Sequence, residues 1–279
     1  KPRRFAMTYT IMRITPLDPW IKQKTNASDL AAWQLSKLNE TLALARGRSP
    51  FYKKHFEGMP ETLSDLDELR QFPFTTPEDI HQNPLRFVCV SQNEIQRIVT
   101  LQSSGTTGEP KRIFFTADDQ ELTIDFFGVG MSTLVEPGER VLIFLPGETP
   151  GSVGDLLRIG LERKGRKPIP YGMVKDPLHA LDMMESQQAD CLVGSPTQIL
   201  GLARRWNPQH KAPRTILLST DYVPAAIVSV LENIWGCKVF NHYGATEMGL
   251  GGGVECEAHR GVHLREADML FEIVDPETG

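Results

Sequence analysis

The chain has 279 residues, enough for one large domain or two smaller ones with a substantial core. Its hydrophobic fraction of 40% and charged fraction of 23% are ordinary for a soluble globular protein. The net charge of -5 provides no basic surface that would neutralise nucleic-acid phosphates. We therefore expect no nucleic-acid partner.

The spacing of the cysteines and the length of the apolar runs indicate in which cellular compartment the protein lies. Four cysteines lie far apart and form no CxxC pair, which argues against a disulfide framework and favours a reducing environment. No apolar run approaches the roughly 20 residues that cross a bilayer, and the basic start is not followed by a signal-type apolar core. We expect a cytoplasmic protein with no membrane partner.

The first hundred residues are predicted to be helical and then irregular. Residues 30–45 have apolar side chains at helical spacing, and prolines and glycines interrupt the chain after them. From about residue 97 the pattern changes to short strands. The sequence therefore predicts an N-terminal helical segment over residues 1–96 and an α/β region over residues 97–279.

The second region alternates short apolar strands with amphipathic helices. The predicted strands cover residues 97–102, 140–145, 167–171, 191–194, 215–218, 238–243 and 270–274. The predicted helices cover residues 117–134, with Thr116 as N-cap, and 151–164, 177–188, 197–206 and 224–235. This alternation predicts an α/β fold with a mostly parallel, helix-covered sheet, in which ligands bind at the carboxyl ends of the strands. The closing residues 275–279 are a turn signal where a hairpin would begin, so we expect a fragment.

A loop of small and hydroxyl-bearing residues follows the strand predicted at 97–102. Its glycines let backbone N–H groups turn toward an anion, its hydroxyls add donors, and its lysine adds positive charge. The spacing differs from a Walker A loop, because two residues separate the glycines and Glu109-Pro110 precedes the lysine. We predict a polyphosphate cradle, the alternative being a flexible linker. The candidate residues are Ser103, Ser104, Gly105, Thr106, Thr107, Gly108 and Lys111.

A second motif, NHYGATE at residues 241–247, lies at the end of the strand predicted at 238–243. Tyr243 offers an aromatic face for stacking, Thr246 a short hydroxyl donor, and Glu247 a hard oxygen ligand for a hard cation such as Mg²⁺. Alone the motif is weak, because a tyrosine at a strand end is more often part of the core or rim. Its combination with the loop at residues 103–111 makes a chance match improbable.

Together, SSGTTGEPK and YGATE resemble the signature motifs of the adenylate-forming superfamily, which includes acyl-CoA synthetases, luciferases and peptide-synthetase adenylation domains. Within it the chain resembles phenylacetate-coenzyme A ligases, whose PFTTKEDL motif is similar to PFTTPEDI at residues 73–80. The resemblance implies the large N-terminal domain of such an enzyme, so that residues 97–279 would bind ATP. It also implies AMP-forming activation of a carboxylic acid as an acyl-adenylate, followed by thioester formation with coenzyme A.

The resemblance also assigns roles to individual residues. Catalysis would rest on positioning and charge stabilisation by Lys111, Thr246 and Glu247, with Glu247 beside Mg²⁺. The nucleotide would contact Asn241, Tyr243, Gly244 and Thr246, with the Tyr243 ring against adenine. The partners implied are therefore a nucleotide and a small-molecule carboxylate.

The acyl side departs from the family. Ser219, Thr220 and Asp221 stand where relatives have a Gly-Ala-Glu turn near the acyl-adenylate, and Gly249 begins a glycine-rich stretch where a ligand can approach the backbone. Residues 146–151, PGETPG, replace the tyrosines that phenylacetate ligases tend to have. An aromatic slot for an aryl ring is thus not evident, and the acid could be small, polar or not an aryl acid.

Residues 255–263 follow the family pattern EC-x4-G-L-H. Cys256, His259 and His263 have donors at spacings that allow a Zn²⁺ site with a fourth ligand from elsewhere. The alternative is a small buried cysteine and a strand histidine with ordinary partners.

Superfamily members also have a downstream ribose-binding aspartate, a hinge and a small C-terminal domain, none of which is found before Gly279. We therefore expect an incomplete enzyme. Two other interpretations stay open, namely adenylation with an acceptor other than coenzyme A, and a nucleotide-binding regulatory domain without turnover. A homodimer is a family-level expectation.

Overall fold

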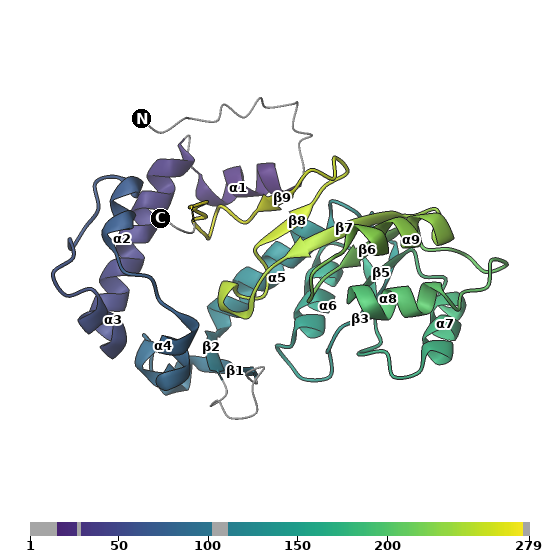
Figure 1. The fold of residues 1–279 in the computed structure, drawn as a ribbon, viewed down its shortest axis with the longest axis horizontal. Helices are drawn as coiled ribbons and strands as arrows, with labels where there is room; N and C mark the ends of the chain where they lie inside the picture. Colours follow the sequence, from purple (N-terminus) through teal and green to yellow (C-terminus); the bar gives the residue numbers. More distant parts are fainter. Residues whose placement is uncertain (1–15, 27–28, 102–110, 276–279) are drawn as a thin grey trace.

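The computed structural model describes residues 16–26, 29–101 and 111–275, and Figure 1 shows their arrangement. The described residues of the N-terminal part form the α-helices α1 (Leu17–Thr25), α2 (Leu30–Arg48), α3 (Pro50–His55) and α4 (Pro77–Gln82). The 3₁₀ helix η1 (Leu66–Gln71) lies between α3 and α4, and the 3₁₀ helices η2 (Pro84–Phe87) and η3 (Gln92–Glu94) follow α4. The helix predicted at residues 30–45 is confirmed as α2, whereas α1 was not predicted.

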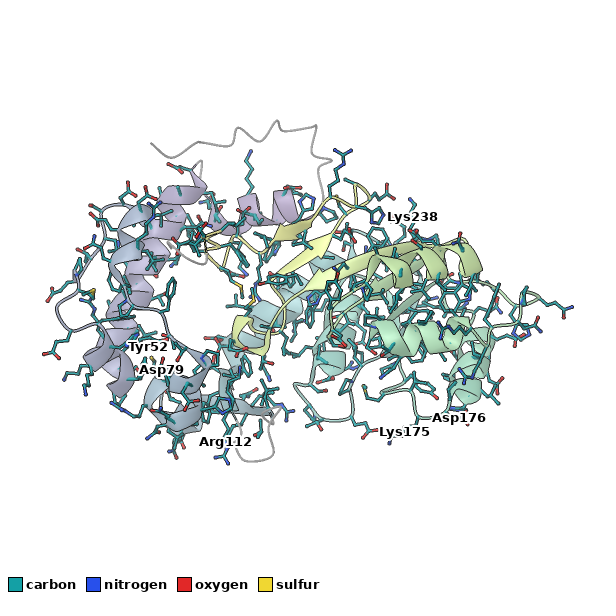
Figure 2. All side chains as sticks on the ribbon, in the orientation of Figure 1. Tyr52, Asp79, Arg112, Lys175, Asp176 and Lys238 are labelled. Atoms are coloured by element: carbon teal, nitrogen blue, oxygen red, sulfur yellow. The ribbon has the colours of Figure 1, made fainter. Side chains whose placement is uncertain are left out.

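Local capping explains where these helices begin. The Asp29 carboxylate accepts hydrogen bonds from the backbone N–H groups of Ala31 and Ala32 at the start of α2. Thr76 and Asp79 form a reciprocal capping box at the start of α4. Figure 2 labels Asp79 on α4 and Tyr52 on α3, whose hydroxyl accepts a hydrogen bond from Thr75 at 3.2 Å. The PFTTPEDI motif is therefore a helix start that joins two elements of the N-terminal part.

A two-stranded antiparallel hairpin follows, formed by β1 (Ile95–Leu101) and β2 (Lys111–Thr116). Leu101 pairs with Lys111 in its register. The strand predicted at 97–102 is confirmed as β1, but β2 was missed because Lys111 was assigned to the preceding loop alone. The first residue of β2 is thus the lysine of the predicted phosphate loop, held by strand pairing.

The main sheet has seven strands in the order β4-β3-β5-β6-β7-β8-β9. Five are parallel, namely β3 (Arg140–Phe144), β4 (Lys167–Pro170), β5 (Cys191–Gly194), β6 (Thr215–Leu218) and β7 (Lys238–Tyr243). Strand β8 (Gly253–Glu255) pairs antiparallel with β7, and the edge strand β9 (Val262–Leu264) pairs antiparallel with β8. The predicted α/β class with a mostly parallel sheet is therefore confirmed.

Helices cover both faces of this sheet (Figure 1). Helices α5 (Ala117–Met131) and α6 (Val153–Arg163) cover one face, packing on Val141 and Ile143 of β3. Helices α7 (Pro177–Ser186), α8 (Pro196–Ala203) and α9 (Ala225–Trp235) cover the other face, packing on Leu142 and Phe144. Successive residues of β3 thus enter opposite cores, as the two-residue period of a strand requires.

The two helices on the first face approach each other at glycines. A Cβ added at Gly128 of α5 would lie 2.8 Å from the backbone oxygen of Gly160 in α6, and one at Gly160 would lie 2.7 Å from the oxygen of Ile124. Both distances are too short for real atoms, so α5 and α6 pack this closely only because both positions are glycine.

The N-terminal part is fastened to the sheet domain by indole and amide groups. The Trp20 indole N–H donates to Asp125 of α5 at 2.9 Å, and that of Trp33 donates to the Ala267 carbonyl at 3.0 Å. The Gln34 side chain donates to the Glu266 carbonyl at 3.0 Å. Helices α1 and α2 are thereby held against α5 and the segment after β9.

One predicted strand is wrong. Residues 270–274 form no strand, because no other strand of the described residues pairs with them, and the Ile273 side chain is 98% exposed. The antiparallel strands β8 and β9 were missed, since each has only three residues, and glycines lie at or next to them at Gly253 and Gly261. None of the described helices has the length and apolar character needed to span a bilayer.

Candidate functional site

A cavity of about 530 Å³ lies beyond the carboxyl ends of β6 and β7. This volume is typical of pockets for small molecules. The lining residues come from the loops that follow these strands, from the start of α6 and from the segment before β8. They are Val153, Ser219, Thr220, Asp221, Tyr222, Val223, Asn241, His242, Tyr243, Gly244, Ala245, Thr246 and Leu250.

Sheet register explains why two distant sequence motifs meet here. Strands β6 and β7 are parallel neighbours, and Leu218 pairs with Asn241. The turn that begins at Ser219 therefore lies beside the motif that continues from Asn241. The structure brings together the predicted acyl-side residues 219–221 and the predicted nucleotide residues Asn241, Tyr243, Gly244 and Thr246, at the strand ends where such sheets bind ligands.

Two tyrosines on the cavity wall expose large aromatic surfaces. Tyr243 is 51% exposed and Tyr222 is 80% exposed. Flat rings of this kind favour stacking against a planar heterocycle. The sequence identified Tyr243 as a candidate but not Tyr222. The position of Tyr222, directly after the turn at residues 219–221 that follows a buried strand, could have indicated a residue of the cavity wall.

The turn after β6 has an unusual backbone. Thr220 has φ 71°, which is rare for a β-branched residue. Strained backbone of this kind clusters at functional sites. At the position of the family's Gly-Ala-Glu turn, this chain therefore has a threonine with left-handed backbone conformation on the cavity wall.

An ion pair connects the hairpin with the loop after β7. The Lys111 ammonium at the start of β2 donates a hydrogen bond to the Glu247 carboxylate in η4 (Thr246–Met248). Burial raises the pKa of Glu247, but the hydrogen bond and charge of Lys111 outweigh it and hold this pKa below its usual value. Two predicted catalytic residues are thus in contact, and Glu247 is ionised near neutral pH.

This carboxylate fits a magnesium ligand. It is an ionised oxygen donor, and its side chain is 36% exposed, so a cation can reach it. Mg²⁺ is usually bound by one or two carboxylates together with substrate phosphates, and a single ionised glutamate near this cavity would fit that ligand set if a phosphate-bearing substrate were bound.

Gly249 was predicted to let a ligand approach the backbone, and that role stays a prediction. Gly249 is not among the residues that line the cavity, and its φ of 65° ends η4 in a left-handed turn. Its carbonyl accepts a hydrogen bond of 2.7 Å from the buried Thr123 hydroxyl on α5. Gly249 therefore anchors the loop that carries Thr246 and Glu247 to α5.

His242, between the predicted residues of its motif, was missed by sequence reasoning. The Ser219 Oγ and His242 Nδ1 atoms lie 2.9 Å apart across the ends of β6 and β7. The other ring nitrogen, Nε2, is buried and has no hydrogen-bond partner in the described part of the chain. Burial lowers the pKa of His242 to about 4, so its ring is neutral at physiological pH.

The three predicted zinc ligands do not converge. Cys256 is buried, the His259 ring lies against Phe240 with centroids 5.2 Å apart, and the His263 Nδ1 atom lies 4.0 Å from an Asp18 oxygen. Across residues 16–26, 29–101 and 111–275, no group of three or more His, Cys, Asp or Glu side chains could hold a metal. The zinc prediction is corrected accordingly, because these donors have separate surroundings.

Six residues of the predicted phosphate loop lie outside the described residues. They are Ser103, Ser104, Gly105, Thr106, Thr107 and Gly108. Their role stays a prediction, while the structure places Lys111 beside the cavity-lining motif through its contact with Glu247.

Comparison with known proteins identifies the family. Residues 64–279 match the family described as AMP-binding enzyme, which is more than half of the chain. The chain belongs to the AMP-binding enzyme family. The resemblance inferred from the two motifs is therefore confirmed, and the nucleotide-sized cavity lies within the matched residues.

Curated relatives include phenylacetate-coenzyme A ligases from several bacteria. That of Thermus thermophilus is 28% identical over 269 residues, covering 90% of this chain and 58% of the relative. That of Pseudomonas putida is 28% identical over 276 residues, covering 94% of this chain and 61% of the relative. The chain thus spans about three fifths of the length of these relatives.

Solved structures share the fold. A 2-hydroxyisobutyryl-CoA ligase in complex with 2-HIB-AMP and CoA, in the thioesterification state, aligns with a TM-score of 0.77 at 19% identity, covering 94% of this chain and 60% of that one. An open conformation of the same ligase aligns with a TM-score of 0.73 at 18% identity, covering 83% and 54%. At these identities the likeness establishes the architecture of the sheet domain.

Proposed function

We propose that this chain is the nucleotide-binding part of an ATP-dependent, AMP-forming carboxylate-CoA ligase. The observation that carries the proposal is the cavity at the ends of β6 and β7, which is lined by residues 243–246 of the YGATE motif and lies next to the Lys111–Glu247 ion pair. Family membership and the phenylacetate-coenzyme A ligase relatives support the same activity.

In the first half-reaction, a carboxylate oxygen of the acid attacks the α-phosphorus of ATP. The bond from this phosphorus to the bridging oxygen breaks, and pyrophosphate leaves. The exposed Tyr243 ring would stack on adenine, the Asn241 side chain would face it, and Thr246 would donate to the α-phosphate. Lys111 would move from Glu247 to the phosphates, while bound Mg²⁺ would supply charge compensation for pyrophosphate at the freed Glu247 carboxylate.

In the second half-reaction, the coenzyme A thiol loses its proton to solvent and its sulfur attacks the acyl carbonyl carbon. The bond from this carbon to the phosphate oxygen breaks, and AMP leaves with the bonding electron pair. Neither half-reaction needs an enzyme nucleophile. The buried thiols of Cys191 and Cys237 agree with this, since burial raises the pKa of each to about 12 and keeps both protonated.

The proposal also covers the division of the chain, its cellular location and its oligomeric state. We propose a division into an N-terminal helical segment, residues 1–96, and an ATP-binding region, residues 97–279, supported by the start of β1 at Ile95. A cytoplasmic location is supported by four free cysteines. A homodimer is supported by the family resemblance only.

Calorimetry of the full-length protein with AMP and with ATP plus Mg²⁺ tests nucleotide binding. Saturable binding supports the proposal, and folded protein that binds neither nucleotide at millimolar concentration contradicts it. Pyrophosphate exchange with a panel of acids then tests adenylation, and its absence favours a regulatory domain without turnover. Coenzyme A dependence of AMP release separates a CoA ligase from an enzyme with another acyl acceptor.

A further inference from the structure

A second, smaller cavity adjoins the nucleotide-sized one. Its volume is about 30 Å³, and it shares Val153, Ser219 and His242 with the larger cavity. It extends between α5, α6 and the sheet, beneath the ends of β6 and β7. The other lining residues are Phe126, Phe127, Gly130, Met131, Leu145, Leu157, Val193, Leu217 and Val254.

The walls of this small cavity suit a hydrocarbon group. Apart from Ser219 and His242, no lining side chain carries nitrogen or oxygen. These two polar side chains lie within hydrogen-bond distance of each other, at 2.9 Å, and the imidazole is neutral near pH 7. A charged substituent would lose its hydration here without a counter-charge, and among the lining side chains of the described residues only His242 Nε2 is a buried polar atom without a hydrogen-bond partner.

The size of the cavity decides which hydrocarbon fits. A cavity of roughly 150 Å³ holds a benzene ring, and about 10–15 Å³ is needed for one water molecule. A volume of about 30 Å³ therefore admits one or two carbon groups and excludes an aromatic ring.

The walls are held in place by the main core. Phe126 is 1% exposed, Met131 2% and Leu157 4%, and all three belong to the core cluster between α5, α6 and the sheet. Because protein interiors are packed as densely as organic crystals, enlarging the cavity for a ring would displace several of these side chains. The PGETPG segment, which contains no tyrosine, agrees with the absence of an aryl slot.

We propose that this cavity receives the hydrocarbon chain of the acid and restricts the substrate to short aliphatic carboxylates with one or two carbons beyond the α-carbon. The proposal rests on the proposed adenylation function. It differs from the substrate in the names of the phenylacetate-coenzyme A ligase relatives. Ser219 and His242 form the border at which the carboxylate, in the larger cavity, meets its chain in the smaller one.

Non-hydrolysable acyl-sulfamoyl-adenosines test the proposal without requiring turnover. Acetyl, propionyl, butyryl and phenylacetyl analogues are titrated into the full-length protein by calorimetry, with AMP as the reference ligand. We expect the propionyl analogue to bind about fourfold tighter than the acetyl one, because burying one methylene contributes that factor. We expect the phenylacetyl analogue to bind at least tenfold more weakly than the propionyl one.

The outcomes separate the two proposals. If neither AMP nor any analogue binds to folded protein, the adenylation proposal fails. If AMP binds and the phenylacetyl analogue binds as tightly as the propionyl one, the size limit alone is overturned. The same holds if chain length has no effect on affinity.

A single methyl group provides a sharper test. Gly130 of α5 and Val254 both line the small cavity, and a Cβ added at Gly130 would lie 3.5 Å from Val254 Cγ1, an ordinary contact, so the added methyl should narrow the cavity. We expect Gly130→Ala to abolish the increase in affinity from the acetyl to the propionyl analogue. The matched control is Gly201→Ala in α8, where an added Cβ meets nothing within 4 Å, and it should retain the gain. An unchanged gain in Gly130→Ala would overturn the proposal.

Discussion

Two polar pairs beside the site differ in exposure and charge. Lys111 and Glu247 form an ion pair whose side chains are 16% and 36% exposed. Ser219 and His242 form a neutral pair whose histidine has a buried ring nitrogen. Water screens the first pair and leaves both groups free to exchange partners, whereas the second is locked by its surroundings. The charged pair is therefore suited to binding ligands, and the neutral pair is suited to shaping the cavity.

The largest expected effect is on catalysis through the charged pair. Lys111→Met should lower the rate of pyrophosphate exchange by about a hundredfold or more, because a preorganised charge aimed at the phosphates is lost. The free energy of unfolding should change by only about 1 kcal/mol, since a partly exposed pair contributes little. Measuring both quantities on the full-length protein checks this. A large loss of stability with unchanged exchange would show that the pair is structural.

The neutral pair should instead control stability against pH. The folded pKa of His242 is about 4, below the ordinary value of 6.5, so the unfolded state binds the proton first as pH falls. The stability due to neutral His242 is therefore fully present above pH 6.5 and is lost progressively toward pH 4. Between pH 6.5 and 5 the loss should be about 2 kcal/mol, at 1.36 kcal/mol per pH unit.

Denaturant unfolding at these two pH values measures that loss. In His242→Gln the loss between pH 6.5 and 5 should be smaller by about 2 kcal/mol, whereas Ser219→Ala, which retains the imidazole, should preserve most of it. If the wild-type and His242→Gln proteins show equal pH dependence, then His242 is not a buried neutral group.

The cavity tyrosines should affect affinity more modestly. Tyr243→Ala should weaken AMP binding by about tenfold, because stacking of a base on an aromatic ring contributes roughly 1–3 kcal/mol. Tyr222→Ala provides the comparison, since Tyr222 lines the same cavity but is 80% exposed. Calorimetry of both variants shows which of the two rings contributes more to AMP affinity. A larger effect at Tyr222 would move the adenine position toward the turn after β6.

The sheet was predictable where burial alone determines it. Strands β5, β6 and β7 have the predicted bounds, because β5 and β6 are buried along their whole length and β7 has the buried pair Val239 and Phe240. The antiparallel edge was not predictable. Strands β8 and β9 have three residues each, and their pairing depends on long-range contacts. The strand expected at residues 270–274 had apolar residues but lacks a neighbour to pair with in the described structure.

The candidate site also has residues that the sequence could identify and contacts that only the folded structure shows. Tyr243, Thr246 and Lys111 could be identified because they belong to contiguous motifs. The contact between Lys111 and Glu247 spans 136 residues and follows from the folded hairpin. The small cavity behind Ser219 and His242 could not be predicted, because its volume depends on how α5 and α6 pack on the sheet.

The smallest effect should come from the anchor behind the charged pair. Thr123→Val keeps the shape of this buried side chain but removes the hydroxyl that donates to the Gly249 carbonyl. Loss of one such hydrogen bond should reduce the free energy of unfolding by about 1 kcal/mol. Because the loop carrying Thr246 and Glu247 would then be held less firmly, affinity for ATP with Mg²⁺ should fall by a few fold. Thr123→Ser, which retains the hydroxyl, should restore that affinity, and equal affinities in the two variants would exclude an anchoring role for this hydrogen bond.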